Sequence, residues 1–421
     1  MSLKKLLIFI FLFFLAATIY AQQSPQVKKY IQDLKYGTPD VRRSAAYALG
    51  EIGDTFVLPA LIKTLRDEDK DVRSSASKAL GKIGDPSAVP ALIEALKDEV
   101  NDVREAAAQS LGQIGDNSAV PALIEVLKDE LKNVRKKAIE ALGKIGPSAK
   151  DAVPSLIETL KYKTTDVGFC AIEALGEIGP AAKDAVPALV QILKNRFKDA
   201  DLFRIPEDAD AIDYKVVKTL GEIGPAAKDA VPELIKRLNW GLDESAGNAV
   251  KALSKIGESA VPALSEALKD KDEQRRWYVI KTLGEIGKPA VPALTKALKD
   301  EVWSNRTGAA SALGKIGPDA KDAVPALIEI LKDEQGDVKR WAAWALCEIG
   351  DTSGIPVVIQ ELKGEDVGFR GWAAKELGKI GDPSALEALA YVAKNDSNEG
   401  VRSLAKEAIA KIKSKTTMEF K

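Results

Sequence analysis

Histidine is absent from all 421 residues of the sequence. This side chain is the usual proton shuttle near neutral pH and the commonest protein ligand of zinc and non-haem iron. Its absence argues against an enzyme, because a serine nucleophile would lack its usual base and a metal site would need carboxylates alone. No spacing of acidic residues stands out as such a cluster. We therefore predict no catalytic residues, no metal and no cofactor.

Cysteine is scarce, since Cys170 and Cys347 are the only two. They lie more than five repeats apart in the pattern described below, whereas a disulfide needs Cα atoms within about 7 Å. We expect two reduced thiols packed inside helices.

An excess of charge of one sign is also missing. The chain has 61 basic and 62 acidic side chains, which gives a formal net charge of −1. Proteins that hold a phosphate backbone usually show a basic excess. Nucleic acid is therefore disfavoured as a partner.

Long apolar runs are confined to the amino terminus. Lys4 and Lys5 precede an apolar run from Leu6 to Ile19, and Ala21 follows it. This pattern is typical of a secretory signal peptide, here residues 1–21, and is short for a membrane span. We expect a periplasmic or secreted protein whose mature chain is not inserted in a membrane. An uncleaved amino-terminal anchor is the alternative.

One phrase, Leu-Gly-x-Ile-Gly, recurs along nearly the whole chain. Most copies are 30 to 33 residues apart, and only the interval from Leu175 to Leu220 is longer, at 45 residues. Such a period means that each unit is one supersecondary element, which buries its apolar face only by stacking on its neighbours. The signature leucines, including two variant copies, are Leu49, Leu80, Leu111, Leu142, Leu175, Leu220, Leu253, Leu283, Leu313, Leu346 and Leu377.

Each repeat predicts two helices. In residues 85–115, apolar side chains three and four apart from Val89 to Leu96 indicate a short first helix, which we name the A helix. Asp102 is placed to cap a second, the B helix, and Gly115 to end it in a left-handed conformation. Repeats differ in length at the turn that joins one repeat to the next. The pattern predicts about twelve A–B pairs between residues 26 and 412.

The stretch from Asp71-Val72-Arg73 to Gly84 resembles the HEAT repeats of the phycobilisome (PBS) lyase type. The resemblance covers most of the chain. It implies an all-α, right-handed α-solenoid with the B helices on the concave side, here a single domain over residues 22–421. It does not carry an activity, because the likeness to bilin lyases is at the level of the repeat only.

The Asp-Val-Arg arginine has two interpretations. It could form an anion-binding ladder, or it could join one layer to the next through turn carboxylates and carbonyls. We favour the second. The positions are Arg42, Arg73, Arg104, Arg135, Arg276, Arg306, Arg370 and Arg402, with Lys339 as a substitute.

The tryptophans cluster, because all six lie between positions 240 and 372. On a helical wheel of the B helix, most of the aromatic residues in this region fall outside the core stripe. They form either an exposed binding strip or packing between adjacent B helices, and the sequence favours neither. The candidate partner-binding residues are Trp277, Tyr278, Trp303, Arg340, Trp341, Trp344 and Trp372.

An insertion at about residues 195–210 lengthens one turn between an A and a B helix. Phe197 and Phe203 within it either grip a partner or fold back onto the solenoid, and we favour the latter.

The function that these features favour is an exported, non-enzymatic scaffold that holds a protein or peptide on its concave B-helix surface. The alternatives are a bilin lyase-like enzyme, a carrier of a chromophore or other small ligand, and a mechanical spacer in the cell envelope. The sequence leaves the oligomeric state open.

Overall fold

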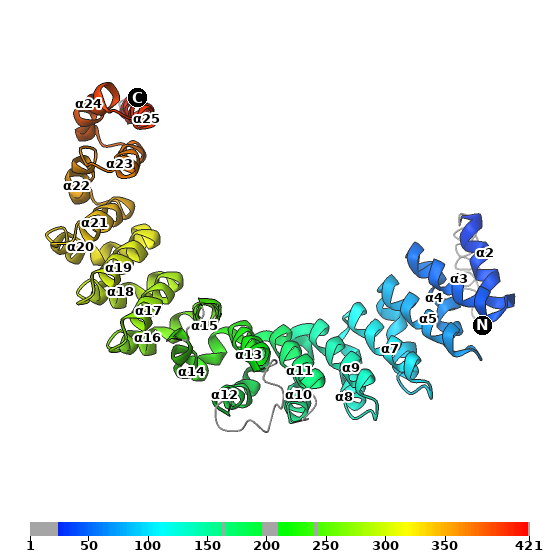
Figure 1. The fold of residues 1–421 in the computed structure, drawn as a ribbon. Coiled ribbons are helices and arrows are strands. Elements are labelled where there is room, and N and C mark those ends of the chain that lie inside the picture. Colours follow the sequence, from blue (N-terminus) through cyan, green and yellow to red (C-terminus); the bar gives the residue numbers. More distant parts are fainter. Residues whose placement is uncertain (1–23, 162–164, 196–208, 240–242, 420–421) are drawn as a thin grey trace, which may run out of the picture. The chain divides into compact units, whose positions relative to one another are not determined.

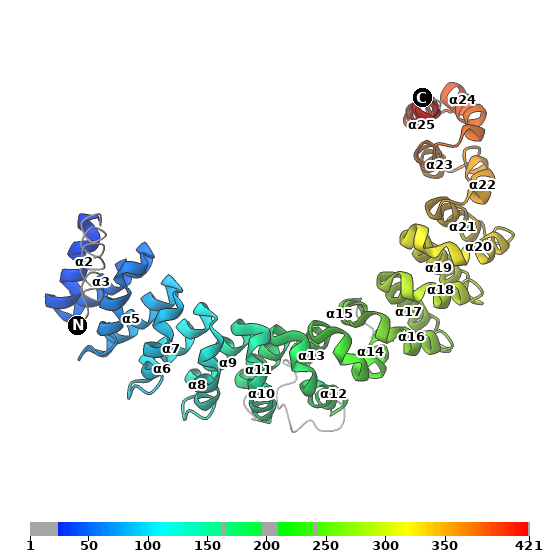
Figure 2. The same cartoon turned by 180° about the vertical axis from the view of Figure 1, so that it is seen from behind.

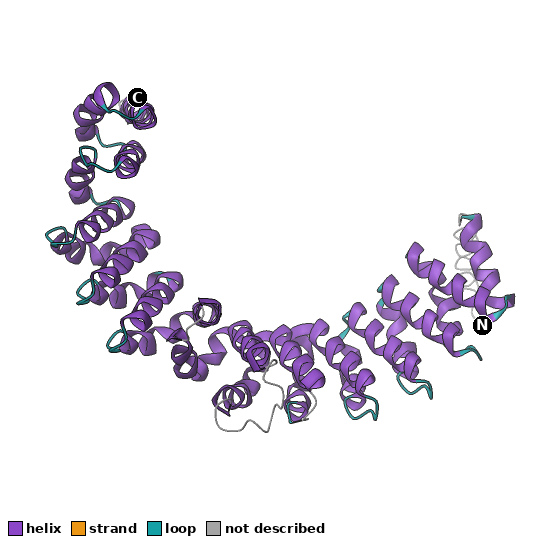
Figure 3. Ribbon diagram, viewed as in Figure 1, coloured by secondary structure: helices purple, strands orange, loops and turns teal. Residues whose placement is uncertain are grey.

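The computed structural model describes residues 24–161, 165–195, 209–239 and 243–419. Every regular element in these ranges is a helix (Figure 3). The chain divides into two compact units, Met1–Ile223 and Gly224–Lys421, which we describe separately. The expected signal peptide and residues 196–208 of the insertion lie outside the described residues, and the single domain stays a prediction.

The first unit contains six A–B pairs within its described residues (Figure 1). Its A helices are α2 (Pro25–Tyr36), α4 (Leu58–Thr64), α6 (Val89–Ala95), α8 (Val120–Val126), α10 (Val153–Thr159) and α12 (Val186–Asn195). Its B helices are α3 (Pro39–Ile52), α5 (Lys70–Ile83), α7 (Asn101–Ile114), α9 (Lys132–Ile145), α11 (Thr165–Ile178) and α13 (Ala209–Ile223).

The second unit has six further pairs, so the expected number of about twelve is confirmed. Its A helices are α14 (Val231–Lys236), α16 (Val261–Ala267), α18 (Val291–Ala297), α20 (Val324–Ile330), α22 (Ile355–Glu361) and α24 (Leu386–Asn395). Its B helices are α15 (Asp243–Ile256), α17 (Glu273–Ile286), α19 (Trp303–Ile316), α21 (Gly336–Ile349), α23 (Val367–Ile380) and α25 (Glu399–Glu419). Within this unit the B helices line the inner side of the curve in both views (Figures 1 and 2).

The repeat phrase sets where each helix begins and ends. α6 begins at Val89 with Pro90 in its first turn, where the missing N–H costs nothing. α7 ends at Gly115, whose φ of 75° lies in the left-handed region that favours glycine. A short 3₁₀ turn, Pro86–Ala88, precedes α6, and a seven-residue turn, Gly146–Ala152, precedes α10. The extra residues of the longer repeats enter at these turns, as predicted.

The core follows the signature leucines. Leu111, Leu220 and Leu313 are completely buried, as are the other signature leucines of the described repeats. Within each unit the B helices contact their own A helices and the neighbouring B helices, and consecutive B helices such as α5 and α7 or α19 and α21 form the main contacts between layers. None of the helices in the described ranges combines the length and apolarity needed to cross a bilayer.

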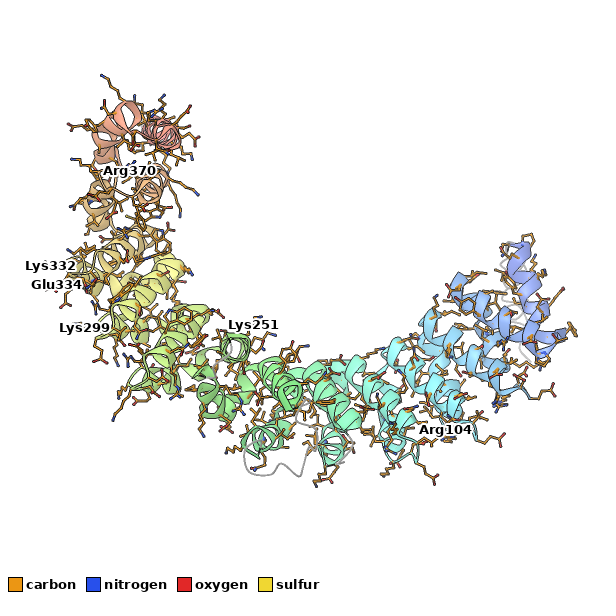
Figure 4. The ribbon with its side chains drawn as sticks, in the orientation of Figure 1. Arg104, Lys251, Lys299, Lys332, Glu334 and Arg370 are labelled. Carbon is orange, nitrogen blue, oxygen red and sulfur yellow. The ribbon has the colours of Figure 1, made fainter. Side chains whose placement is uncertain are left out.

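In six repeats the Asp-Val-Arg arginine, or the arginine at its position, joins two layers, which confirms the favoured interpretation for these repeats. Arg73 donates from Nε to Asp98 Oδ2 at 2.7 Å and from Nη1 to the carbonyl of Asp67 at 2.9 Å. Asp98 belongs to the turn of the next repeat, so one guanidinium ties two turns together. The same arrangement joins Arg42 to Asp67, Arg104 to Asp129, Arg276 to Asp300, Arg306 to Asp333 and Arg370 to Asp396. Figure 4 labels Arg104 in the first unit and Arg370 in the second.

The cap of the model repeat differs from the prediction. α7 begins at Asn101, and Asp102 lies inside its first turn and makes no cap. Asp98 accepts the N–H of Val100 at 2.9 Å in its place. The aspartate that Arg73 holds is thus already positioned to order the start of the helix, which leaves Asp102 free of that role.

The pair of Arg370 and Asp396 predicts that the protein loses stability in acid. The hydrogen bond from Arg370 lowers the pKa of Asp396, so the folded state favours the ionised carboxylate. A pKa that is lower in the folded state adds stability above the unfolded value of about 3.9 and loses it as pH falls toward the folded value. We expect the urea midpoint of the protein to drop between pH 5 and pH 3. Asp396→Asn should flatten that drop, and an unchanged slope in this variant would contradict the assignment.

Candidate functional site

A groove of about 560 Å³ opens on the B-helix row of the second unit. It is lined by residues of three successive B helices, α17, α19 and α21. Three of the seven candidate residues, Trp277, Trp303 and Trp341, line it together. The structure thus brings part of the predicted strip into one concave site.

The three tryptophans are the large apolar side chains of this groove. Their exposed fractions are 41% for Trp277, 46% for Trp303 and 37% for Trp341. Trp277 lies on α17, six residues before Leu283, and Trp341 lies on α21, five residues before Leu346. Trp303 is the first residue of α19, between them in the stack. Apolar side chains left this exposed in one concave place are typical of a contact surface.

Small residues of the middle helix lie between Trp277 and Trp341. Gly308 is on α19, five residues before Leu313, so it occupies the register that Trp341 occupies on α21. A Cβ built on Gly308 would meet only Ile280 Cγ2, at 3.5 Å, which is an ordinary contact. The groove is therefore deep at Gly308 because a side chain is missing there, and not because the backbones are forced together.

The charged residues of the groove are Lys281, Glu285 and Lys315. The Lys281 Nζ lies 5.5 Å from the centroid of the Trp277 ring. Glu285 accepts a hydrogen bond from Ser254 Oγ on α15 at 2.8 Å. No ion pair joins Lys281 or Lys315 to a carboxylate of the described residues. The rim of the groove is therefore weakly basic.

Two of the other candidates are packed, which corrects part of the strip. Tyr278 is only 7% exposed, and its ring lies edge-on to Trp277 with the centroids 5.0 Å apart. Trp344 covers Gly314 on α19 so closely that a Cβ at Gly314 would lie 2.5 Å from the ring. It also contacts Trp341 edge-on, with a centroid distance of 5.3 Å. Trp344 fills space between adjacent B helices, as the second interpretation proposed.

The last two candidates do not reach the groove. Trp372 packs against the hydrophobic cluster of α22 to α25. Arg340 donates to Glu361 at 3.1 Å and to Asp337, and its guanidinium lies 3.6 Å from the centroid of the Phe369 ring. Arg340 is thus held by its own layer and the next. Arg340 therefore does not line the groove, although it precedes the exposed Trp341 in the chain.

Ten of the thirteen residues that line the groove were missing from the sequence prediction, among them Gly308, Lys281 and Lys315. One signal could have found the first. Five residues before the signature leucine, three consecutive repeats read Tyr278, Gly308 and Trp341, which places a glycine between two large aromatic residues. The lysines carry no such signal, because lysine is common at these exposed positions.

A second groove, of about 360 Å³, lies on the B-helix row of the first unit. Its lining at equivalent registers includes Arg43, Ser75, Lys78 and Glu105, with no aromatic residue among the residues that line it. The hollow between B helices therefore comes from the repeat, whereas the tryptophans belong to the second unit.

The cysteines and acidic residues show little sign of reactive chemistry. Both cysteines are free, and burial raises the pKa of the Cys347 thiol to about 12, so it stays protonated. Within the ranges that the structure describes, no three acidic or cysteine side chains gather as ligands for a metal ion.

Comparison with known proteins identifies the family of the repeat. The family model of HEAT repeats matches residues 27–112, 92–161, 120–201, 261–337 and 324–410, and that of the PBS lyase HEAT-like repeat matches residues 246–270. No curated protein matches the sequence.

Solved structures share the fold. Karyopherin Kap121p bound to the extreme C-terminus of the protein phosphatase Cdc14p is 16% identical, with a TM-score of 0.57 over 92% of this chain and 50% of Kap121p. Kap121p bound to Pho4p is also 16% identical, with a TM-score of 0.56 over 92% of this chain and 49% of Kap121p. The chain spans about half the length of Kap121p, and at this identity the likeness concerns the fold alone.

The HEAT-repeat model covers well over half of the sequence, and the structure is a stack of the helix pairs that this repeat forms. The protein therefore belongs to the HEAT-repeat family, an all-α solenoid fold that typically serves as a protein-binding scaffold.

Proposed function

We propose that this protein is an exported, non-enzymatic scaffold that holds a protein or peptide partner on the B-helix row of its second unit. The observation that carries the proposal is the groove in which Trp277, Trp303 and Trp341 remain exposed together. Tryptophan is the residue most enriched at the energetic centres of protein interfaces. A matched groove on the first unit lacks aromatic residues, so the repeat itself does not explain them.

The fold supports a protein partner. Kap121p has been solved with the extreme C-terminus of Cdc14p and, separately, with Pho4p. A solenoid of this class thus accommodates segments of other proteins. The absence of histidine and the raised pKa of the Cys347 thiol favour binding over catalysis.

Export rests on the amino-terminal pattern of Lys4, Lys5 and the apolar run that follows. Amino-terminal sequencing of the protein recovered from the extracytoplasmic fraction should begin near Gln22. Recovery of the intact amino terminus in the cytoplasm would contradict export.

Crosslinking in the extracytoplasmic fraction tests the binding surface. We expect a partner that is recovered with the parent chain and whose affinity falls roughly 30-fold or more in Trp277→Ala/Trp341→Ala, because truncating interface hot spots costs at least about 2 kcal/mol. Tyr47→Ala is the control, since Tyr47 is 66% exposed on α3 of the other unit. Equal partner recovery from the parent and the double variant would reject this surface.

A small flat ligand is a second candidate, and the size of the groove favours it. A volume of about 560 Å³ lies within the usual range of small-molecule sites, about 300–1,000 Å³. Absorbance of the purified protein tests this candidate, because a bound chromophore such as a tetrapyrrole would be visible. Colourless protein that takes up no added tetrapyrrole would end it.

A further inference from the structure

We propose that the groove receives one aromatic side chain from an acidic segment of the partner, with the ring above Gly308 and the carboxylates facing Lys281 and Lys315. The inference rests on the proposed scaffold function and names the chemistry of what the groove binds. It follows from three properties of the site: its empty centre, its exposed walls and the charges on its rim.

The centre of the groove has room for a ring because Gly308 has no side chain. Glycine inside a helix such as α19 costs about 0.5–1 kcal/mol relative to alanine. No close approach of the backbone requires it, since a Cβ would meet Ile280 at an ordinary 3.5 Å. Packing within the unit therefore does not require a glycine at this position. The effect of Gly308 is to make the groove deeper.

The walls favour an aromatic guest. Trp277 and Trp341 stand on the helices that flank α19, and Trp303 begins α19 itself. A ring between them can meet indole faces and edges in the offset or edge-to-face arrangements that aromatic pairs prefer. Two internal examples already occur beside the groove, Trp277 with Tyr278 at 82° and Trp341 with Trp344 at 87°.

The rim selects an acidic segment. Lys281 and Lys315 have no carboxylate partner among the described residues, and the one acidic lining residue, Glu285, is held by Ser254. A cationic guest would meet two ammonium groups, and the Lys281 Nζ already lies 5.5 Å from the Trp277 ring, where such a cation would bind. Carboxylates beside the aromatic anchor would instead find complementary charge.

The segment is short. α17 and α21 are two layers apart, and packed helices lie about 8–10 Å from their neighbours, so the groove spans roughly 16–20 Å. An extended chain covers about 3.3 Å per residue. A segment of about six residues therefore crosses the groove.

Binding of defined labelled peptides to the mature chain, measured by fluorescence anisotropy, tests the proposal. One peptide carries a single Phe among Asp and Glu residues. A second has Ala in place of the Phe, and a third has Lys in place of the acids. We expect only the first to bind, and we expect added salt to weaken it.

Filling the groove supplies the matched variants. Gly308→Leu should weaken the acidic Phe peptide roughly 30-fold, the loss of one hot-spot contact, while circular dichroism melting stays at or above the parent value. Gly247→Leu places the same side chain inside α15, away from the groove lining and in open space, and should leave binding unchanged. Lys281→Glu/Lys315→Glu should abolish the preference for acidic over basic peptide.

The outcomes separate this inference from the scaffold function. Stronger binding of the Lys peptide, no binding of the acidic Phe peptide at millimolar concentration, or no effect of Gly308→Leu each overturns the inference. If the natural partner still depends on Trp277 and Trp341 in those cases, the scaffold function stands. If binding of the natural partner does not depend on Trp277 and Trp341, the proposed function is rejected as well.

Discussion

Leu220→Asp should lower the free energy of unfolding by on the order of 5 kcal/mol, the range reached when an unpaired charge is placed in a core. Leu220 is completely buried on α13, and Ile223, one turn later, is buried as well. The same effect is expected for Ile223→Asp.

The solenoid makes this loss local. Because each repeat contacts only its neighbours, the layers around α13 should open first while more distant layers stay folded. Urea unfolding followed by circular dichroism should therefore change from one transition to two. A melting curve that matches the parent would show that Leu220 does not face the core.

Two control variants on the same helix distinguish the effect of burying a charge from the effect of the substitution itself. Leu220→Met keeps the volume and should cost less than about 1.5 kcal/mol. Tyr214→Asp introduces the same carboxylate at a position that is 46% exposed and should change stability by about 0.5 kcal/mol at most. A large loss in Tyr214→Asp would mean that charge on α13, and not burial, destabilises the unit.

The fold could be predicted because the same signals for the start, the core and the end of a helix recur in copy after copy of the repeat. Each copy supplies the Pro90-type helix start, the buried leucine and the Gly115-type end, and these are local properties of the sequence. The layer-joining role of Arg73 also followed, because its partner, Asp98, sits in the same turn of the next copy.

The site was predicted only in part, because the exposure of its side chains depends on packing between neighbouring layers. A helical wheel places Trp344 and Trp341 outside the core stripe alike, yet Trp344 is packed and Trp341 is exposed. The difference is set by the neighbouring helix: Gly314 leaves a place that the Trp344 ring fills. The offset between neighbouring helices decides which side chain of one layer fills a gap in the next. The pattern of a single helix carries no information about this offset.

Arg276→Met should cost about 3 kcal/mol or more, because removing one partner of a buried ion pair leaves the other unpaired. Arg276 and Asp300 have side-chain exposures of 5% and 8%, with Nε and Oδ2 2.9 Å apart. Arg276 also donates to the carbonyl of Asp270 at 2.7 Å, which the methionine would leave without this donor. Denaturant unfolding measures the loss.

The neighbouring Arg275 provides the matched control. Its pair with Asp270 is 26% and 29% exposed and lies within one turn, so Arg275→Met should cost less than about 1 kcal/mol. Equal losses in the two variants would contradict a special role for the link between layers.

The position of Arg276 ties this stability to the binding groove. Arg276 precedes Trp277 on α17, and Asp300 lies in the turn that leads into α19 and Trp303. The ion pair therefore fixes the offset between the two helices that carry two of the three groove tryptophans. Arg276→Met should weaken partner binding under conditions in which the chain is still folded, whereas Arg275→Met should not. Parent-like affinity in a folded Arg276→Met protein would show that the groove keeps its shape without this link.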